Sequence, residues 1–173
     1  MPGYGIEIYS DDKEYDFSGF DCGEGSLNVF LQDHLIRQHR SRILRAYMLI
    51  NRDTRPRIMG FYTLSGSSFE KAALPSNSQK RHIPYVNVPS VTLGRLAVDK
   101  TLLGQAWGST LVAHAMTVVY QASQAVGIHG LFVDALNENA QQFYRKLGFI
   151  PLVRENARSL FYPTKSMEKL FRP

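Results

Sequence analysis

Short runs of alternating or continuous apolar residues recur along the chain and predict β-strands. The two runs on either side of residues 53–56 are close together in sequence, which predicts an antiparallel hairpin. The run after residue 89 is apolar on both faces and therefore predicts a central strand. The expected strands are residues 6–9, 43–52, 57–70, 90–99, 129–136 and 159–164.

Apolar spacings of three and four residues predict three helices between these strands. The first is expected to begin at Ser26, as its cap, and to run to about residue 42. The second follows a glycine-bearing turn and spans about residues 109–125. The third lies within residues 137–149 and ends at Gly148, because glycine commonly terminates helices.

The order of these elements predicts an α+β fold with a mixed, mostly antiparallel sheet flanked by helices. Residues 71–89 contain several residues that break regular structure, so we expect a long excursion over the surface there. No internal repeat or linker divides the chain, which predicts one domain over residues 1–173. The sequence contains neither a dinucleotide-binding G-x-G-x-x-G nor a P-loop.

Composition and charge narrow the classes of function. Lys and Arg number 20 and Asp and Glu 15, so the net charge is +5, which favours polyanionic partners over very basic substrates. Cys22 is the single cysteine, which excludes an intrachain disulfide and fits a reducing, cytoplasmic setting. Residues 101–133 carry no Asp, Glu, Lys or Arg, but their polar residues and glycines favour burial against a sheet over a membrane span. The amino terminus shows no secretory signal, so we expect a cytoplasmic protein without a membrane anchor.

The expected strand, turn and helix over residues 92–116 have the layout of an anion-binding site. A turn that presents consecutive N–H groups at the positive end of a helix can hold a pyrophosphate without basic side chains. Gly104 and Gly108 allow a ligand to approach the backbone closely. A purely structural turn is the alternative interpretation.

A second motif, Asn-x-x-Ala-x-x-Phe-Tyr-x-x-x-Gly-Phe, begins at Asn137 and includes Tyr144. Together with the turn it resembles the acetyl-coenzyme A core of the GNAT N-acetyltransferase superfamily. Nearly the whole chain, from Ile6 to about Phe171, resembles the GNAT toxins of type II toxin-antitoxin modules (the TacT/AtaT-like group). This resemblance implies a cytoplasmic toxin that acetylates the α-amino group of aminoacyl-tRNA and so blocks translation. It also implies a homodimer and an antitoxin of the ribbon-helix-helix type.

The resemblance further implies roles for individual residues. The strand edge at Leu96, Ala97 and Val98 would pair with the pantetheine arm, and Asn137 would contact the same arm. Tyr144 would face the thioester sulfur. The pyrophosphate would bind the turn formed by Leu103, Gly104, Gln105, Ala106, Trp107, Gly108 and Ser109.

The implied chemistry is direct acetyl transfer. The amine attacks the acetyl carbonyl, a tetrahedral oxyanion forms, and the coenzyme A thiolate leaves with a proton or hydrogen bond from Tyr144 as general acid. Neither motif offers an evident general base. An α-amine has a pKa of roughly 7.7–8.0, lowered further by the adjacent ester, so a neutral fraction exists at pH 7 and water could carry the proton away.

The turn departs from the family pattern, which reads Gln/Arg-x-x-Gly-x-Gly/Ala. Here Leu103 and Ala106 occupy the first and middle positions, and only Gly108 matches. If the middle position requires a positive φ, alanine costs roughly 1–2 kcal/mol there, and its methyl group crowds the phosphates. A weakened enzyme or a non-catalytic acyl-coenzyme A binder is therefore an alternative. Another is a GNAT enzyme that acetylates a small amine or a protein amino group, for which an acidic acceptor cleft is expected.

Basic residues cluster after the first helix and suit a tRNA backbone, with a solvated basic face as the alternative. The cluster comprises Arg37, Arg40, Arg42 and Arg45, together with His34 and His39. Lys80, Arg81 and His82 are a second candidate contact.

Three further side chains are weighed singly. Arg95 lies in an apolar strand and is expected to be buried, where it either pairs with a carboxylate or meets the acceptor end of the RNA. His114 is in phase with apolar residues of its helix, which favours a hydrogen-bonded core histidine, and Trp107 is expected to pack the turn. The histidines lack metal-ligand spacing, so no metal is expected.

Overall fold

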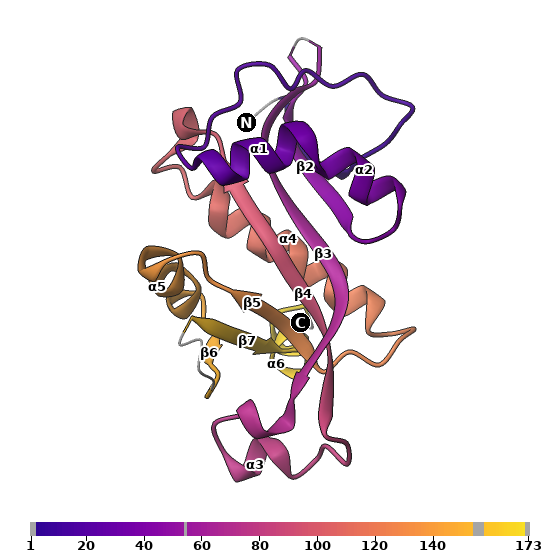
Figure 1. Ribbon diagram of the computed structural model, residues 1–173, viewed down its shortest axis with the longest axis vertical. Helices are drawn as coiled ribbons and strands as arrows, with labels where there is room; N and C mark the ends of the chain where they lie inside the picture. The colour runs from indigo at the N-terminus through magenta and orange to yellow at the C-terminus, as the bar shows by residue number, and fades with distance from the viewer. Residues whose placement is uncertain (1–2, 54, 154–157, 172–173) are drawn as a thin grey trace. The chain divides into compact units, whose positions relative to one another are not determined.

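The computed structural model describes residues 3–53, 55–153 and 158–171 and has an α+β fold (Figure 1). Its elements, with 3₁₀ helices labelled η, are β1 (Tyr4–Ile8), α1 (Gly25–Asp33), α2 (Leu35–Arg40), β2 (Arg45–Asn51), β3 (Arg57–Glu70), η1 (Lys71–Ala73), α3 (Asn77–Lys80), β4 (Asn87–Val98), η2 (Lys100–Leu102), α4 (Trp107–Ala122), β5 (Gly130–Asp134), α5 (Glu138–Lys146), β6 (Ile150–Pro151), β7 (Ser159–Pro163) and α6 (Thr164–Phe171).

Hydrogen bonds connect the seven strands in the order β1-β2-β3-β4-β5-β7-β6. The pairs β1–β2, β2–β3, β5–β7 and β6–β7 are antiparallel, whereas β4 and β5 are parallel. The predicted mixed, mostly antiparallel sheet and the predicted hairpin are therefore confirmed.

Contacts along the chain define two compact units, each built from two segments. Unit 1 comprises Met1–Ser65 and Gly94–Ala115, and unit 2 comprises Gly66–Leu93 and Met116–Pro173. That one domain covers residues 1–173 stays a prediction.

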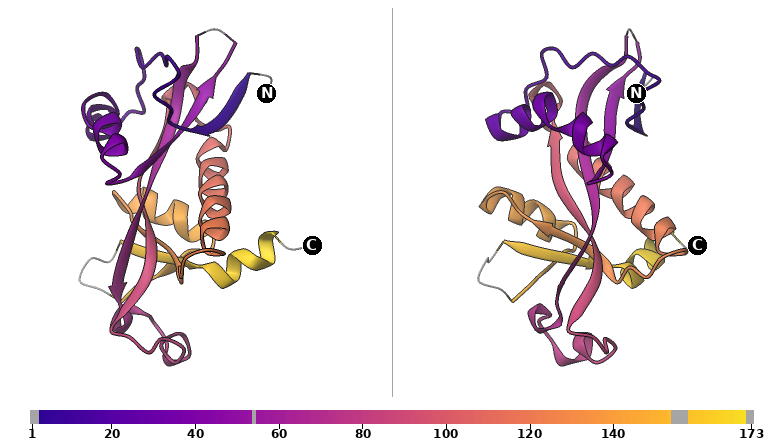
Figure 2. Two further views of the ribbon diagram at one scale, coloured as in Figure 1. Left: turned by 90° about the vertical axis from the view of Figure 1, so that its right-hand side faces the viewer. Right: turned by 45° about the vertical axis from the view of Figure 1, so that its right-hand side comes forward.

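Unit 1 has apolar cores on both faces of its strands. Helices α1 and α2 lie on one side of β2 and β3, and α4 lies on the other (Figure 2). On the first side Phe30, Leu31 and Leu35 pack with Phe61 of β3. On the second side Leu111 of α4 packs with Leu49 and Met59 of the strands.

The single helix expected from Ser26 onward is two helices, so that prediction is wrong in its detail. His34 at the junction has φ −127° and ψ −32°, outside the helical range. Glu24 precedes the first helical residue, so Ser26 lies inside the first turn and is not the cap. Apolar spacing carries no sign of the break, because Leu31, Leu35 and His39 remain four residues apart and all three are buried.

Unit 2 buries part of the segment that was expected to run over the surface. Ala73, Leu74 and Ile83 join a core with Phe132 and Phe161 of β5 and β7. The Lys71 amide donates to the Val86 carbonyl at 2.7 Å, which closes the excursion on itself. The excursion therefore has an apolar inner side. Strand β6 and helix α6 were not predicted.

The helix ends depend on local backbone chemistry. Asn137 caps α5, and its Oδ1 accepts a hydrogen bond from the Ala140 amide at 2.9 Å. Gly148 follows α5 with φ +99°, which confirms it as the terminator. Helix α4 begins at Trp107, two residues earlier than expected, and ends at Ala122. Among the described residues, no helix is both long and apolar enough to cross a membrane.

Candidate active site

The turn before α4, in unit 1, exposes its backbone. Gly104 has φ +81° and Ala106 has φ +61°, so the middle position does require the left-handed conformation. Residues 103–106 are exposed, and space is open where a Cβ on Gly104 would stand. The Thr110 amide makes the first helical hydrogen bond, to the Ala106 carbonyl at 3.1 Å. The amides of Trp107, Gly108 and Ser109 belong to the first turn, where helical N–H groups lack an intrahelical acceptor. This backbone arrangement is suited to an anion.

A buried carboxylate network holds the residues that lead into this turn. Asp99 accepts hydrogen bonds from the Thr101 amide at 3.0 Å, the Thr101 hydroxyl at 2.8 Å and the Asp21 amide at 3.1 Å. Burial disfavours the charged form of Asp99, yet these hydrogen bonds leave its pKa below the usual value. Lys100 bonds the Asp21 carboxylate at 2.9 Å and, with the Gly23 amide and Asn28, keeps the pKa of Asp21 low. The sequence analysis missed this network, because its members are close only in the fold.

Strand β4 presents an edge beyond its pairing with β5. The register with β5 covers only Ser90, Val91 and Thr92, whereas β4 continues to Val98. The Asp99 amide donates to Met59 of β3 at 2.8 Å, and the Arg95 amide donates to the Thr63 hydroxyl of β3 at 3.1 Å. Alternate residues of a strand direct their backbone groups to opposite edges. Leu96 and Val98 therefore direct theirs away from β3, while Ala97 directs its own toward β3.

Tyr144, in unit 2, is a buried ring with an accessible hydroxyl. The side chain is 5% exposed and packs edge to face against Phe143 and Phe149, with centroids 5.1 and 5.2 Å away. Within the described residues its hydroxyl forms no hydrogen bond, and no fully buried side-chain oxygen there lacks a partner, so the hydroxyl reaches the surface. Burial raises the pKa of Tyr144 well above its usual value. The phenol therefore stays protonated at neutral pH.

The remaining predicted cofactor-site residues are divided between the two units. Trp107 packs as expected, against Tyr4 at a centroid distance of 5.4 Å in unit 1. Asn137 lies in unit 2 and uses its Oδ1 as the α5 cap, which leaves its amide nitrogen for another contact.

The predicted RNA-contact arginines all lie in unit 1. Arg37, Arg40 and Arg42 are exposed, and Arg45 is half-buried. Arg40 forms an ion pair with Asp11 at 2.7 Å, and Arg45 donates to the His39 carbonyl at 3.1 Å. Arg42 has φ +59° just after α2. The exposed guanidinium groups of Arg37 and Arg42 are the better placed of the four for a polyanion.

Two sequence predictions about single side chains have opposite outcomes. Arg95 is exposed rather than buried, because β4 directs it outward, and its guanidinium carbon lies 3.8 Å from the centroid of the Phe30 ring. His114 is confirmed as a hydrogen-bonded histidine, since its Nδ1 lies 2.7 Å from the Tyr62 hydroxyl. The described residues contain no cluster of three or more His, Cys, Asp or Glu that could hold a metal ion.

Comparison with known proteins assigns the family. The model of the GNAT acetyltransferase domain matches residues 45–151. A tRNA-acetylating toxin of Mycobacterium tuberculosis is 32% identical over 149 residues, 86% of each chain. The structure of AtaT with acetyl-methionyl-tRNAfMet is 62% identical and superposes with a TM-score of 0.94, covering 98% of this chain and 99% of that one. A tyrosine-to-phenylalanine variant of AtaT, bound to the C-terminus of the antitoxin AtaR and to acetyl-CoA, is 57% identical with a TM-score of 0.87 and 99% coverage of both chains. This chain belongs to the GNAT acetyltransferase family, in which its relatives include tRNA-acetylating toxins.

Proposed function

We propose that this protein is a toxin that transfers an acetyl group from acetyl-CoA to the α-amino group of an aminoacyl-tRNA. The observation that carries the proposal is the similarity to AtaT over nearly the full chain, together with the exposed amides of the turn before α4. Acetylation would remove the nucleophilic amine that peptide-bond formation requires, so translation would stop. Because aminoacyl-tRNA is a cytoplasmic substrate, we place the reaction in the cytoplasm.

The residues of unit 1 fit an acyl-CoA. Amides of Gly104 and of residues 106–109 would bind the pyrophosphate, with Leu103 and Gln105 at the rim of the turn. Backbone groups of Leu96 and Val98 would pair with the amides of the pantetheine arm, in the manner of an added strand, with Ala97 between them. Acetyl-CoA supplies the activated thioester.

The proposed transfer uses Tyr144 as its acid. The neutral α-amine forms a bond to the acetyl carbonyl carbon, and the bond from that carbon to sulfur breaks. Tyr144 gives its hydroxyl proton to the departing sulfur, and it regains a proton, through water, from the nitrogen that has become an amide. The raised pKa of Tyr144 suits this role, and Asn137 would position the arm from the start of α5.

The partners follow the same similarity. The exposed arginines at residues 37 and 42, with Arg40, Arg45 and Arg95 near them in the sequence or on β4, would contact the tRNA backbone and acceptor end. An AtaT structure contains the C-terminus of the antitoxin AtaR, and we propose a corresponding antitoxin of the ribbon-helix-helix type for this chain, which would act as a homodimer.

Labelled acetyl-CoA tests the proposal directly. The protein is incubated with labelled acetyl-CoA and a pool of aminoacyl-tRNA, and with free amines and protein as separate acceptors. Label on aminoacyl-tRNA that is lost in Tyr144→Phe is the expected result. Label only on free amines or protein would refute the tRNA substrate, and no label on any acceptor would favour a non-catalytic acyl-CoA binder.

A further inference from the structure

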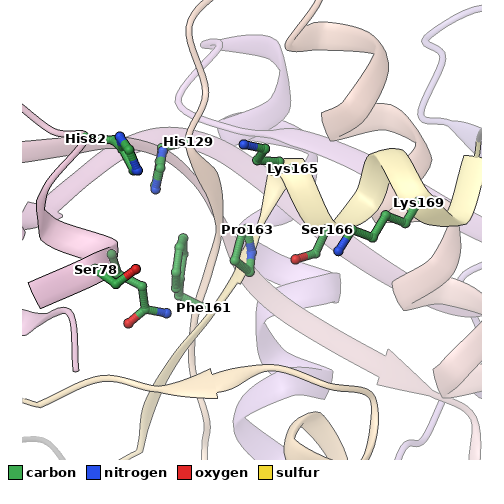
Figure 3. Close-up of a pocket in the computed structure, with 9 residues that line it drawn as sticks. Ser78, His82, His129, Phe161, Pro163, Lys165, Ser166 and Lys169 are labelled. Carbon is green, nitrogen blue, oxygen red and sulfur yellow. The ribbon is translucent and has the colours of Figure 1, made fainter. Parts of the chain in front are cut away.

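Unit 2 contains a pocket whose lining is basic. The pocket has a volume of about 260 Å³, and Figure 3 shows side chains from three separate segments around it. Four of the lining residues are Lys or His, and none is a carboxylate. The lining residues are Ser78, Gln79, His82, His129, Phe161, Pro163, Lys165, Ser166 and Lys169.

The fold fixes the start of α6 against the segment that carries His129. The Thr164 amide donates to the His129 carbonyl at 2.9 Å, and the Thr164 hydroxyl donates to the Ile128 carbonyl at 2.8 Å. The His129 ring stacks on the buried Phe161 ring, with centroids 5.9 Å apart and planes at 9°. One wall of the pocket is therefore a fixed part of the structure.

Positive charge gathers at this pocket without compensation. Lys165 and Lys169 are four residues apart and so share one face of α6, where two like charges destabilise a helix by roughly 0.2–0.5 kcal/mol. In the described part of the chain neither lysine forms an ion pair. Burial lowers the pKa of His129, and the nearby His82 lowers it further. An anion would relieve the repulsion between these groups.

We propose that this pocket binds a phosphate of the RNA backbone, as a second contact for the tRNA besides the arginines of unit 1. The inference rests on the proposed function, which supplies the RNA. The volume lies below the roughly 300–1,000 Å³ of sites for whole small molecules, which suits one anionic group. Lysine, serine and glutamine side chains are common contacts to phosphate oxygens. Lys80 and Arg81, next to His82 in the sequence, extend the charge for neighbouring phosphates.

The salt dependence of tRNA binding tests the proposal. Binding of deacylated tRNA is measured by fluorescence anisotropy across a salt series, for the wild type and for Lys165→Gln/Lys169→Gln. Loss of two phosphate contacts should reduce the slope of log K against log salt by about 2. Lys165→Arg/Lys169→Arg keeps both charges and should restore the slope. Lys13→Gln/Arg52→Gln, which removes two exposed charges in unit 1, is the matched control for net charge.

Several outcomes would overturn the proposal. An unchanged slope in the double glutamine variant would do so, as would an equal reduction in the unit 1 control. Weaker binding of CoA with unchanged tRNA binding would assign the pocket to a nucleotide phosphate. Loss of antitoxin binding with unchanged tRNA binding would assign it to an acidic protein segment. If the wild type fails to acetylate aminoacyl-tRNA, the proposed function itself fails, whatever the variants show.

Discussion

Replacing Ala106 with glycine probes the strain in the turn before α4. Ala106 has φ +61°, a conformation that costs an L-residue roughly 1–2 kcal/mol and costs glycine almost nothing. Glycine also makes the unfolded chain more flexible, which opposes the gain by about 0.4–1 kcal/mol. We therefore expect Ala106→Gly to raise the free energy of unfolding by up to about 1 kcal/mol, equivalent to an increase in Tm of about 2–4 °C for a chain of this size.

A matched substitution elsewhere in the same region separates strain from the general effect of glycine. Ala113 is exposed within α4, so Ala113→Gly should lower the free energy of unfolding by about 1 kcal/mol. Denaturant unfolding measures both variants, and calorimetric titration should show that Ala106→Gly binds acetyl-CoA at least as tightly as the wild type. Equal destabilisation by the two substitutions would refute the strain at Ala106.

Four further predictions follow from the site and the buried groups. Tyr144→Phe should lower kcat at least 100-fold in the acetylation assay, with the Kd for acetyl-CoA unchanged, because it removes only the proton donor; a kcat near that of the wild type would remove Tyr144 from the chemistry. The initial rate should rise as the α-amine deprotonates near pH 8 and then stay level to about pH 9.5, since the raised pKa of Tyr144 keeps the acid protonated; a fall above pH 8.5 would contradict this. Asn137→Ala should cost about 1 kcal/mol in chemical unfolding through the lost α5 cap, whereas an unchanged midpoint would show that the cap contributes nothing. Burial and the Arg45 charge lower the pKa of His39, so the unfolded chain binds its proton more tightly; Tm should be constant above about pH 6.5 and fall below it, and a level Tm down to pH 5.5 would be inconsistent with that burial.

Much of the fold could be predicted because its elements carry local signals. Alternation located β2 and β3, and Gly148 fixed the end of α5 through its positive φ. The departure at Ala106 was visible in the turn motif, but its backbone conformation had to come from the structure. Local signals thus predicted where the candidate site lies in the sequence and which position in it is strained.

The rest depends on contacts between distant residues. The break at His34 leaves the apolar spacing intact, and the exposure of Arg95 follows from how β4 lies against α1. The support that Asp99 gives to the turn joins residues 78 positions apart. The basic pocket combines α3, His129 and α6, and only the lysine pair on α6 left a trace in the sequence, as a four-residue spacing.

The most direct test of the central claim is mass spectrometry of tRNA from cells that express the protein without an antitoxin. After RNase digestion, the account predicts aminoacyl-adenosine that carries one acetyl group on its α-amine, in cells with the wild type and not in cells with Tyr144→Phe. Growth arrest with tRNA ends that remain free of acetyl groups would contradict it.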